Sequence, residues 1–145
     1  LDCRAEREQI VEQFGPLAEE RQIQIRIRGA DATIDCDRSM FRQAMSNLLS
    51  NAIRYSFENA IVKVAVSTND EHTKITVSNP GPKISDDHLQ SLFARFFRAD
   101  PSRKNHGQGV GLGLTIARSL LHMNGAKLTV SSDDNLTVFV VSFHK

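Results

Sequence analysis

Tryptophan is absent from this sequence of 145 residues, which has a single tyrosine and only two cysteines. Cys3 and Cys36 have no neighbours at metal-ligand spacing, and two cysteines are too few for a disulfide framework, so we expect a reducing compartment. No apolar run approaches the roughly 20 residues that cross a bilayer, and no basic stretch followed by an apolar one marks a secretory signal. These absences exclude a disulfide-stapled domain and predict a cytoplasmic one.

Neither sign of charge dominates, since 18 Lys and Arg residues are balanced by 17 Asp and Glu, for a net charge of +1. Without an excess of basic residues to neutralise phosphates, bulk binding to nucleic acid or to a membrane surface is excluded, and only a local site stays open. The length and the hydrophobic content of 40% suit one globular domain over residues 1–145. Because the sequence opens on Leu1 within a charged helical pattern, we expect it to be part of a longer chain.

Hydrophobic periodicity predicts interleaved helices and strands. Apolar residues at helical spacing predict helices over 1–20, 41–55, 85–94 and 111–123, the first kinked or broken early by Pro16. Alternating patterns predict strands over 23–27, 33–36, 61–66, 73–77, 127–132 and 137–143, whereas 97–109 is expected to be a loop. Strand pairs joined by short turns should be antiparallel. The predicted fold is therefore α+β, a two-layer α/β sandwich whose mixed sheet of about five strands is covered on one face by about three helices.

Four glycines alternate in the segment that opens the last predicted helix, at Gly107, Gly109, Gly111 and Gly113. Such spacing lets the backbone approach a ligand closely, and the helix N-terminus favours negative charge, so a phosphate site is one interpretation. The segment lacks the Lys-Ser/Thr ending of a P-loop and follows a loop instead of the strand of a dinucleotide fingerprint. A flexible linker before a helix is the alternative.

Two asparagines are stacked on the helix predicted over 41–55. Asn47 and Asn51 are four residues apart and share a face, with Arg54 a turn further along. Carboxamide oxygens suit magnesium, which keeps several waters and bridges substrate phosphates. A polar face turned to solvent is the alternative.

The strand predicted over 73–77 runs into Asn79-Pro80-Gly81-Pro82. The two prolines give the Asn79 side chain a fixed direction, and a carboxamide can both accept from and donate to the edge of an adenine base. Ordinary turn chemistry explains the same residues.

Taken in order, these three segments resemble the N, G1 and G2 boxes of the ATP-binding catalytic domain of sensor histidine kinases, which has the GHKL-type (Bergerat) fold of gyrase, Hsp90 and MutL ATPases. The segment 92–103 is similar to the F box and the start of the ATP lid of that family. The residues of the N box and lid are most similar to those of the heavy-metal (copper/silver) sensing branch.

The resemblance implies a role for each matching residue. Asn51 would bind magnesium, with Asn47 and Arg54 near the phosphates as the other catalytic positions. Tyr55 would lie against the base. The remaining nucleotide-binding positions would be Asn79, Gly81 and Ile84 at the base, and Gly107, Gly109, Gly111, Leu112, Gly113 and Leu114 at the lid and phosphates.

Two features of the lid and F box leave alternatives open. Arg98 and Arg103 would reach the triphosphate, or they belong to a solvated basic loop. Phe93, Phe96 and Phe97 would dock a neighbouring helical hairpin or pack under the lid, and core packing is the alternative for Phe93.

One position departs from the family pattern, because Asn79 stands where an aspartate usually reads adenine. A neutral amide accepts the same hydrogen bond without charge assistance, so the expected affinity for ATP is lower.

The resemblance also separates phosphotransfer from hydrolysis. Members that hydrolyse ATP have a glutamate as general base where this chain has Asn47, and an amide cannot take up a proton at neutral pH. We therefore expect a protein-histidine kinase that transfers the γ-phosphate of Mg-ATP to a histidine on a separate helical hairpin. The alternatives are a nucleotide-gated interaction module without phosphotransfer and a GHKL-type ATPase.

The implied partners are that dimerisation and phosphoacceptor hairpin and a cognate response regulator. None of the histidines here has the sequence context of the family's phosphoacceptor; they are His72, His88, His106, His122 and His144. The chain would then be the cytoplasmic domain of a bacterial inner-membrane protein, with no direct contact to the membrane or to nucleic acid.

Overall fold

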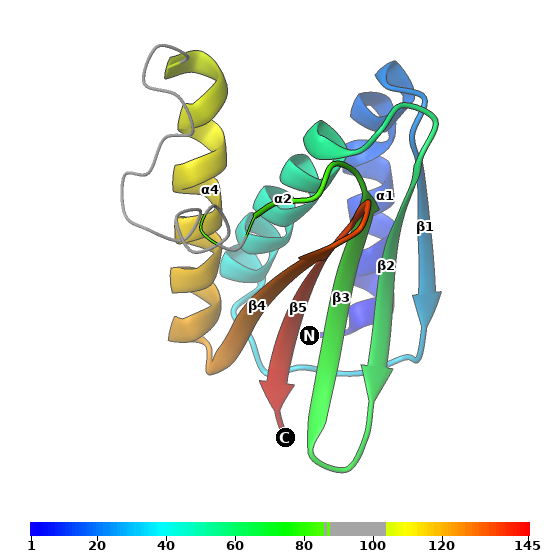
Figure 1. Cartoon of the computed structure of the whole chain (residues 1–145). Coiled ribbons are helices and arrows are strands. Elements are labelled where there is room, and N and C mark those ends of the chain that lie inside the picture. Colours follow the sequence, from blue (N-terminus) through cyan, green and yellow to red (C-terminus); the bar gives the residue numbers. More distant parts are fainter. Residues whose placement is uncertain (86, 88–103) are drawn as a thin grey trace.

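The computed structural model describes residues 1–85, residue 87 and residues 104–145, and for 104–112 it describes the backbone alone. Figure 1 shows the order of the elements. The helices are α1 (Cys3–Glu20), α2 (Arg38–Tyr55) and α4 (Lys104–Met123). The strands are β1 (Gln24–Gly29), β2 (Ile61–Thr68), β3 (His72–Pro80), β4 (Ala126–Asp133) and β5 (Leu136–His144).

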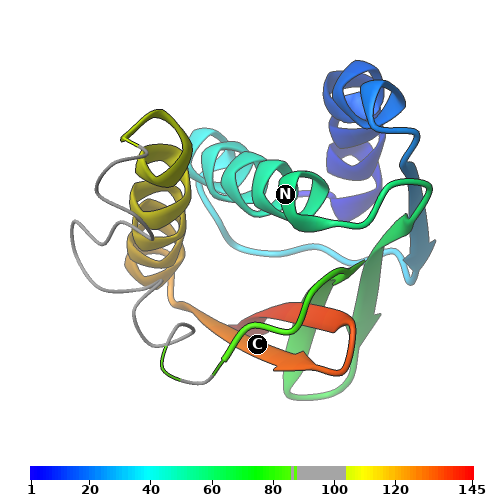
Figure 2. The same cartoon turned by 45° about the horizontal axis from the view of Figure 1, so that its top comes forward.

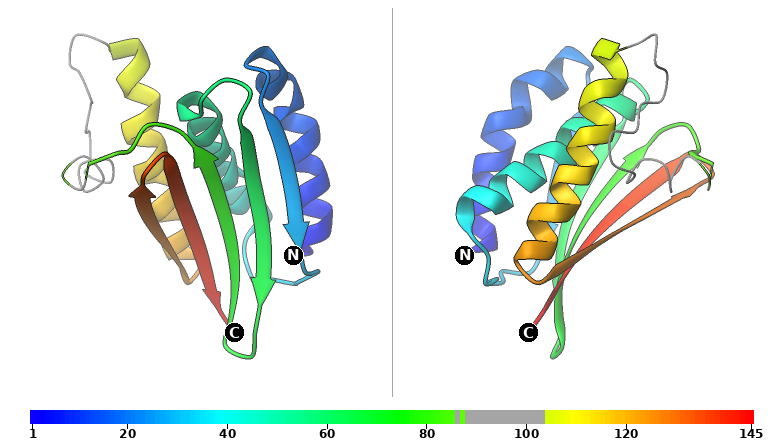
Figure 3. Two further views of the ribbon diagram at one scale, coloured as in Figure 1. Left: turned by 45° about the vertical axis from the view of Figure 1, so that its right-hand side comes forward. Right: turned by 90° about the vertical axis from the view of Figure 1, so that its left-hand side faces the viewer.

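The strands form a 5-stranded sheet in the order β1-β2-β3-β5-β4. β1 pairs with β2 in parallel, and the other neighbours are antiparallel. The parallel pair is joined by a crossover through α2, because parallel neighbours cannot be joined by a tight turn. α1, α2 and α4 lie on one face of this mixed sheet, as Figures 2 and 3 show. The predicted α+β two-layer fold is confirmed.

The core lies between α2 and the helix-facing side of the sheet. Alternate residues of each strand point inward, as in β3, where buried and more exposed positions alternate over most of its length. Leu48 and Leu49 of α2 and Val77 and Phe139 of the sheet are 0% exposed. Burial of such side chains contributes about 1.5–3 kcal/mol each. α2 is thus fixed along its length, and the polar residues on its remaining faces are held in defined places.

Helix α1 continues through Pro16 to Glu20, so the predicted early break is wrong, whereas a kink stays a prediction. Steric conflict before a proline involves the Cβ of the preceding residue, and Gly15 has none. Burial of Phe14 and Ala18 on either side holds both halves against the core. Arg42 of α2 binds Glu6 of α1 through two hydrogen bonds of 2.8 and 3.2 Å, which fixes the two helices together.

The strand predicted over 33–36 is not among the described strands, and that prediction is wrong. This segment pairs with the start of the chain, because Cys3 N donates to Ala32 O and Ile34 N donates to Leu1 O, both at 2.9 Å. Only a single bridge between Asp2 and Thr33 has strand geometry.

The last helix begins at Lys104, not near Gly111, so the part of the predicted loop over 104–109 is helical. Glycine's low helix propensity favoured the loop, but propensity is a weak guide that the rest of the fold overrides. β3 likewise continues to Pro80, beyond the predicted end. The helix predicted over 85–94 and the loop over 97–103 lie outside the described residues, apart from positions 85 and 87.

None of the helices in the described part of the chain is long and apolar enough to span a membrane.

Candidate functional site

Helix α2 is capped at both ends, and this positions the asparagines on it. The Asp37 carboxylate accepts a hydrogen bond of 2.9 Å from Met40 N at the first turn. At the other end Ser56 Oγ donates to Ala52 O at 2.6 Å. The Arg21 guanidinium, just after α1, donates to three carbonyl groups at the C-terminal end of α2, those of Ile53 and Arg54 in its last turn and of the cap residue Ser56.

A guanidinium at this place stabilises the helix because it satisfies orphan carbonyls and opposes the negative end of the helix dipole. Arg21 therefore fixes the backbone on which Arg54 and Tyr55 stand. The sequence pattern gave no sign of Arg21, since its partners are more than thirty positions away.

Asn51 lies near the middle of the second half of α2 and is 7% exposed. Its Oδ1 is buried and has no hydrogen-bond partner among the described residues. An unpaired buried acceptor costs about 1–3 kcal/mol. A hard cation would satisfy this carboxamide oxygen, so the group present here fits the magnesium ligand that the sequence predicts.

Asn47, one turn earlier, joins α2 to α4. Its Nδ2 donates to the Gly113 carbonyl at 3.0 Å, and its Oδ1 accepts from Gln43 Nε2 at 3.2 Å. The N-box and G2-box segments predicted from sequence are thus in direct contact. Gln43 was missed at the sequence level, although its position four residues before Asn47 places it on the same helix face.

Asn79 lies at the end of β3, 2% exposed and paired in register with Thr137 of β5. Pro80 O accepts a hydrogen bond from Phe57 N, and Gly81 N donates to Asn135 O, both at 3.0 Å. The turn after Asn79 is therefore held between the end of α2 and the β4–β5 turn.

Gly81 is required where it stands. A Cβ added there would lie 2.3 Å from the Tyr55 carbonyl oxygen, far inside van der Waals contact. The G1-box turn thus approaches the end of the helix that carries Asn51, and the two segments meet at Tyr55.

Tyr55 is 38% exposed at this junction. Partial burial raises the pKa of its hydroxyl, and the neighbouring Arg54 lowers it by a smaller amount. Arg54 is exposed, and Ile84 is partly buried, with its backbone N donating to Ser132 Oγ at 2.8 Å.

The structure describes the backbone of the whole glycine segment, and the surroundings of its last two residues. Gly107, Gly109, Gly111 and Leu112 lie on the helical backbone of α4. Gly113 contacts Asn47, and Leu114 is 1% exposed within the core. The predictions for Arg98 and Arg103, and for Phe93, Phe96 and Phe97, concern residues outside the described ones.

The sequence over 36–145 matches the family described as histidine kinase-, DNA gyrase B-, and HSP90-like ATPase. The chain is 40% identical over 129 residues to the sensor histidine kinase CusS of Escherichia coli K12, covering 89% of this chain and 27% of that protein. It is 38% identical over 144 residues to the sensor protein CzcS of Cupriavidus metallidurans, covering 99% of this chain and 30% of CzcS. The chain therefore spans less than a third of these relatives.

Solved structures share the fold. The catalytic domain of histidine kinase ThkA matches with a TM-score of 0.86 at 24% identity, covering 100% of this chain and 95% of that one. The mycobacterial sensor histidine kinase MprB matches with a TM-score of 0.79 at 24% identity, covering 99% and 95%. The family match covers well over half of the chain, which therefore belongs to the histidine kinase-, DNA gyrase B-, and HSP90-like ATPase family as an ATP-binding catalytic domain of the histidine kinase type.

Proposed function

We propose that this domain binds Mg-ATP and transfers the γ-phosphate to a histidine on a separate helical hairpin, as the catalytic part of a sensor histidine kinase of the heavy-metal sensing branch. The observation that carries the proposal is the buried Asn51 Oδ1, which lacks a partner among the described residues. It lies on the helix that contacts both the Gly113 and the Gly81 segments. The unpaired Asn51 oxygen would be free to bind the magnesium ion that accompanies the triphosphate of ATP.

Each group of site residues would bind a different part of Mg-ATP. Asn51 would hold magnesium, which when bound neutralises phosphate charge, while Asn47 and Arg54 would act beside the phosphates. Tyr55, Asn79, Gly81 and Ile84 would form the base end, where the buried Asn79 amide would accept a hydrogen bond from the adenine amino group. The phosphates would be bound by the glycine segment, through Gly107, Gly109, Gly111, Leu112, Gly113 and Leu114. Arg98 and Arg103 would reach the phosphates from the lid. Catalysis of this kind is positioning plus electrostatic stabilisation, with no nucleophile supplied by the site.

Phosphotransfer is favoured over hydrolysis by the chemistry of Asn47. Its amide donates to Gly113 O and accepts from Gln43, so it acts as a fixed support, and an amide does not take up a proton from water at neutral pH. The ATP would therefore survive until an acceptor histidine is presented.

We infer the partners from the histidine kinase family, and the greater length of the relatives leaves room for further domains. Because the chain spans less than a third of CusS and CzcS, we assign the phosphoacceptor hairpin, the sensor and the membrane anchor to the remainder of the protein. A response regulator would receive the phosphate from the hairpin. The domain itself would work on the cytoplasmic side of a bacterial inner membrane.

A transfer assay tests the proposal. The domain is mixed with Mg-ATP labelled at the γ-phosphate and with the separately produced hairpin of the full-length protein, and an acid-labile label on the hairpin is measured. Label on the native hairpin but not on a hairpin with the acceptor histidine replaced by Gln supports the kinase. ATP binding without transfer would favour the interaction module, and steady phosphate release by the domain alone would favour the ATPase.

A further inference from the structure

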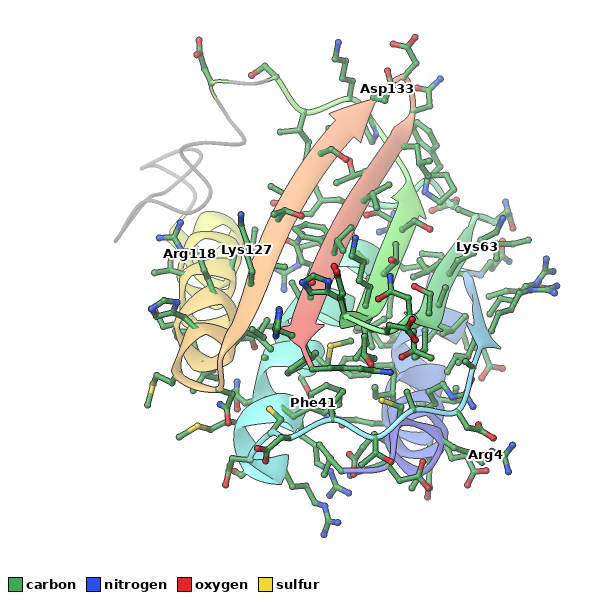
Figure 4. All side chains as sticks on the ribbon, turned by 90° about the horizontal axis from the view of Figure 1, so that it is seen from below. Arg4, Phe41, Lys63, Arg118, Lys127 and Asp133 are labelled. Carbon is green, nitrogen blue, oxygen red and sulfur yellow. The ribbon has the colours of Figure 1, made fainter. Side chains whose placement is uncertain are left out.

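Two histidines meet at the end of the sheet that is remote from Asn79. β3 begins with His72 and β5 ends with His144, and the antiparallel register pairs these two residues directly. Their imidazole rings have centroids 5.0 Å apart at an interplanar angle of 87°. Figure 1 shows this end of β3 beside the C-terminus, away from the end of α2, and Figure 4 is viewed from this side.

The backbone around both histidines is fixed by hydrogen bonds. Asn69 Oδ1 accepts from both Glu71 N and His72 N at 2.8 Å, and Asn69 N donates to His72 O at 2.9 Å. Lys145 N donates to Glu71 O at 2.8 Å, which ties the end of β5 to the β2–β3 turn. The distance between the two side chains is therefore set by the sheet and not by a flexible loop.

Both rings lie on the open face of the sheet. Thr73 and Phe143, the inner neighbours in the same register, are buried under the helices, at 1% and 5% exposed. His72 is partly exposed and His144 exposed, so both rings are accessible from solvent. Metal–nitrogen bonds of about 2.0–2.1 Å at a tetrahedral angle put two imidazole centres roughly 5 Å apart, which is the spacing observed here.

We propose that His72 and His144 together bind one divalent transition-metal ion, with water in the remaining positions. The pair would supply two ligands, and among the described residues no third His, Cys, Asp or Glu side chain is grouped with them, so the protein would leave the other positions to water. Neutral imidazole suits Cu²⁺, Ni²⁺ and Zn²⁺ and not Mg²⁺, which prefers oxygen. The site is therefore chemically separate from the magnesium position at Asn51.

Titration of the untagged chain with Cu²⁺, Ni²⁺ or Zn²⁺ in separate calorimetric runs tests this site. We expect one ion per chain, with Cu²⁺ bound most tightly, as the Irving–Williams order requires. His72→Gln and His144→Gln should each weaken binding by about tenfold or more, since even a lost outer partner of a metal ligand costs about 10–100-fold. His122→Gln, at an exposed histidine on α4, should leave binding unchanged.

Two spectroscopic and thermal readouts complete the test. Electron paramagnetic resonance of bound Cu²⁺ should show coupling to two imidazole nitrogens in the native chain and to one in either variant. Metal at about 100 times its Kd should lower the unfolding equilibrium constant about a hundredfold, because the ion binds only where β3 and β5 are paired. Circular dichroism confirms that the variants are folded. Three results would overturn the proposal. They are metal binding as tight in folded His72→Gln and His144→Gln as in the native chain, loss of binding in His122→Gln alone, and no saturable binding by the native chain.

Discussion

The two ends of strand β3 differ in burial, although the same ladder of hydrogen bonds pairs both ends with β5. At one end Asn79 is 2% exposed, beneath a turn that is held by Phe57 N and Asn135 O. At the other end His72 is partly exposed and His144 exposed, and the register of β3 with β5 places their backbones side by side. The buried end places single atoms by contact with several elements, whereas the open end only sets a distance between two side chains.

This difference sets what each end tolerates. A substitution at the buried end should disturb the contacts with both α2 and the β4–β5 turn. A substitution at the open end should remove one imidazole and change little else. The variants below test that contrast, beginning with the one expected to have the largest effect.

Gly81→Ala should break the buried end most severely. The new Cβ would meet the Tyr55 carbonyl at 2.3 Å, and forcing the two backbones apart should cost about 1–3 kcal/mol of unfolding free energy. ATP affinity should fall as well, because Asn79 and Tyr55 move apart. Urea unfolding and ATP titration measure both effects.

Gly113→Ala is the matched control among the site glycines. A Cβ there would lie 3.9 Å from Asn47, an ordinary contact, and in a helix the change should be neutral or raise stability by up to about 1 kcal/mol. Equal destabilisation by the two substitutions would contradict the close approach described at Gly81.

Arg21→Ala should come next. Loss of the donor to the Ile53, Arg54 and Ser56 carbonyls should lower the unfolding free energy by about 1–2 kcal/mol. ATP affinity should fall too, since the end of α2 carries Arg54 and Tyr55. Arg28→Ala, at an exposed arginine of β1, serves as control. If Arg21→Ala matches that control in urea, the guanidinium is not a functional helix cap.

Asn51→Leu should separate stability from binding. The substitution removes an unpaired buried acceptor, so the unfolding free energy should stay the same or rise by up to about 1 kcal/mol. Thermal unfolding without nucleotide measures this effect. A clear loss of stability would mean that the Asn51 oxygen has a structural partner in solution.

Titration of Tyr55 should give the smallest effect. Burial raises its pKa, so its contribution to stability is complete below the ordinary tyrosine pKa and is lost as the pH rises through the raised value. Tyr55 is the only tyrosine and the chain has no tryptophan, so its ultraviolet absorbance reports this residue alone. ATP should raise the pKa further by covering the ring. A midpoint at or below that of free tyrosine would contradict the partial burial of the side chain.

The sequence was sufficient for the elements whose residues carry a periodic pattern. Apolar residues at helical spacing predicted α2, and the alternation with short turns predicted both hairpins of the sheet. The resemblance placed Asn47 and the glycine segment near the same phosphates, and in the structure Asn47 contacts Gly113; the nucleotide-binding roles of these residues stay predictions.

What the sequence could not supply depends on contacts between distant residues. Arg21 caps α2 from another helix, and no local pattern marks such a role. The segment 33–36 alternates like a strand, yet its Ile34 exchanges two hydrogen bonds with Leu1, because the N-terminus lies beside it. The fit of Gly81 against Tyr55 likewise appears only once β3 and α2 are placed together.

Calorimetric titration of ATP into the domain, with and without magnesium, tests most directly the claim that the Asn51 oxygen is kept for the metal. The native chain should bind ATP more tightly with magnesium, Asn51→Ala should lose that gain, and Asn51→Asp, which restores an oxygen, should retain it. A magnesium gain that is equal in the native chain and in folded Asn51→Ala would contradict the account.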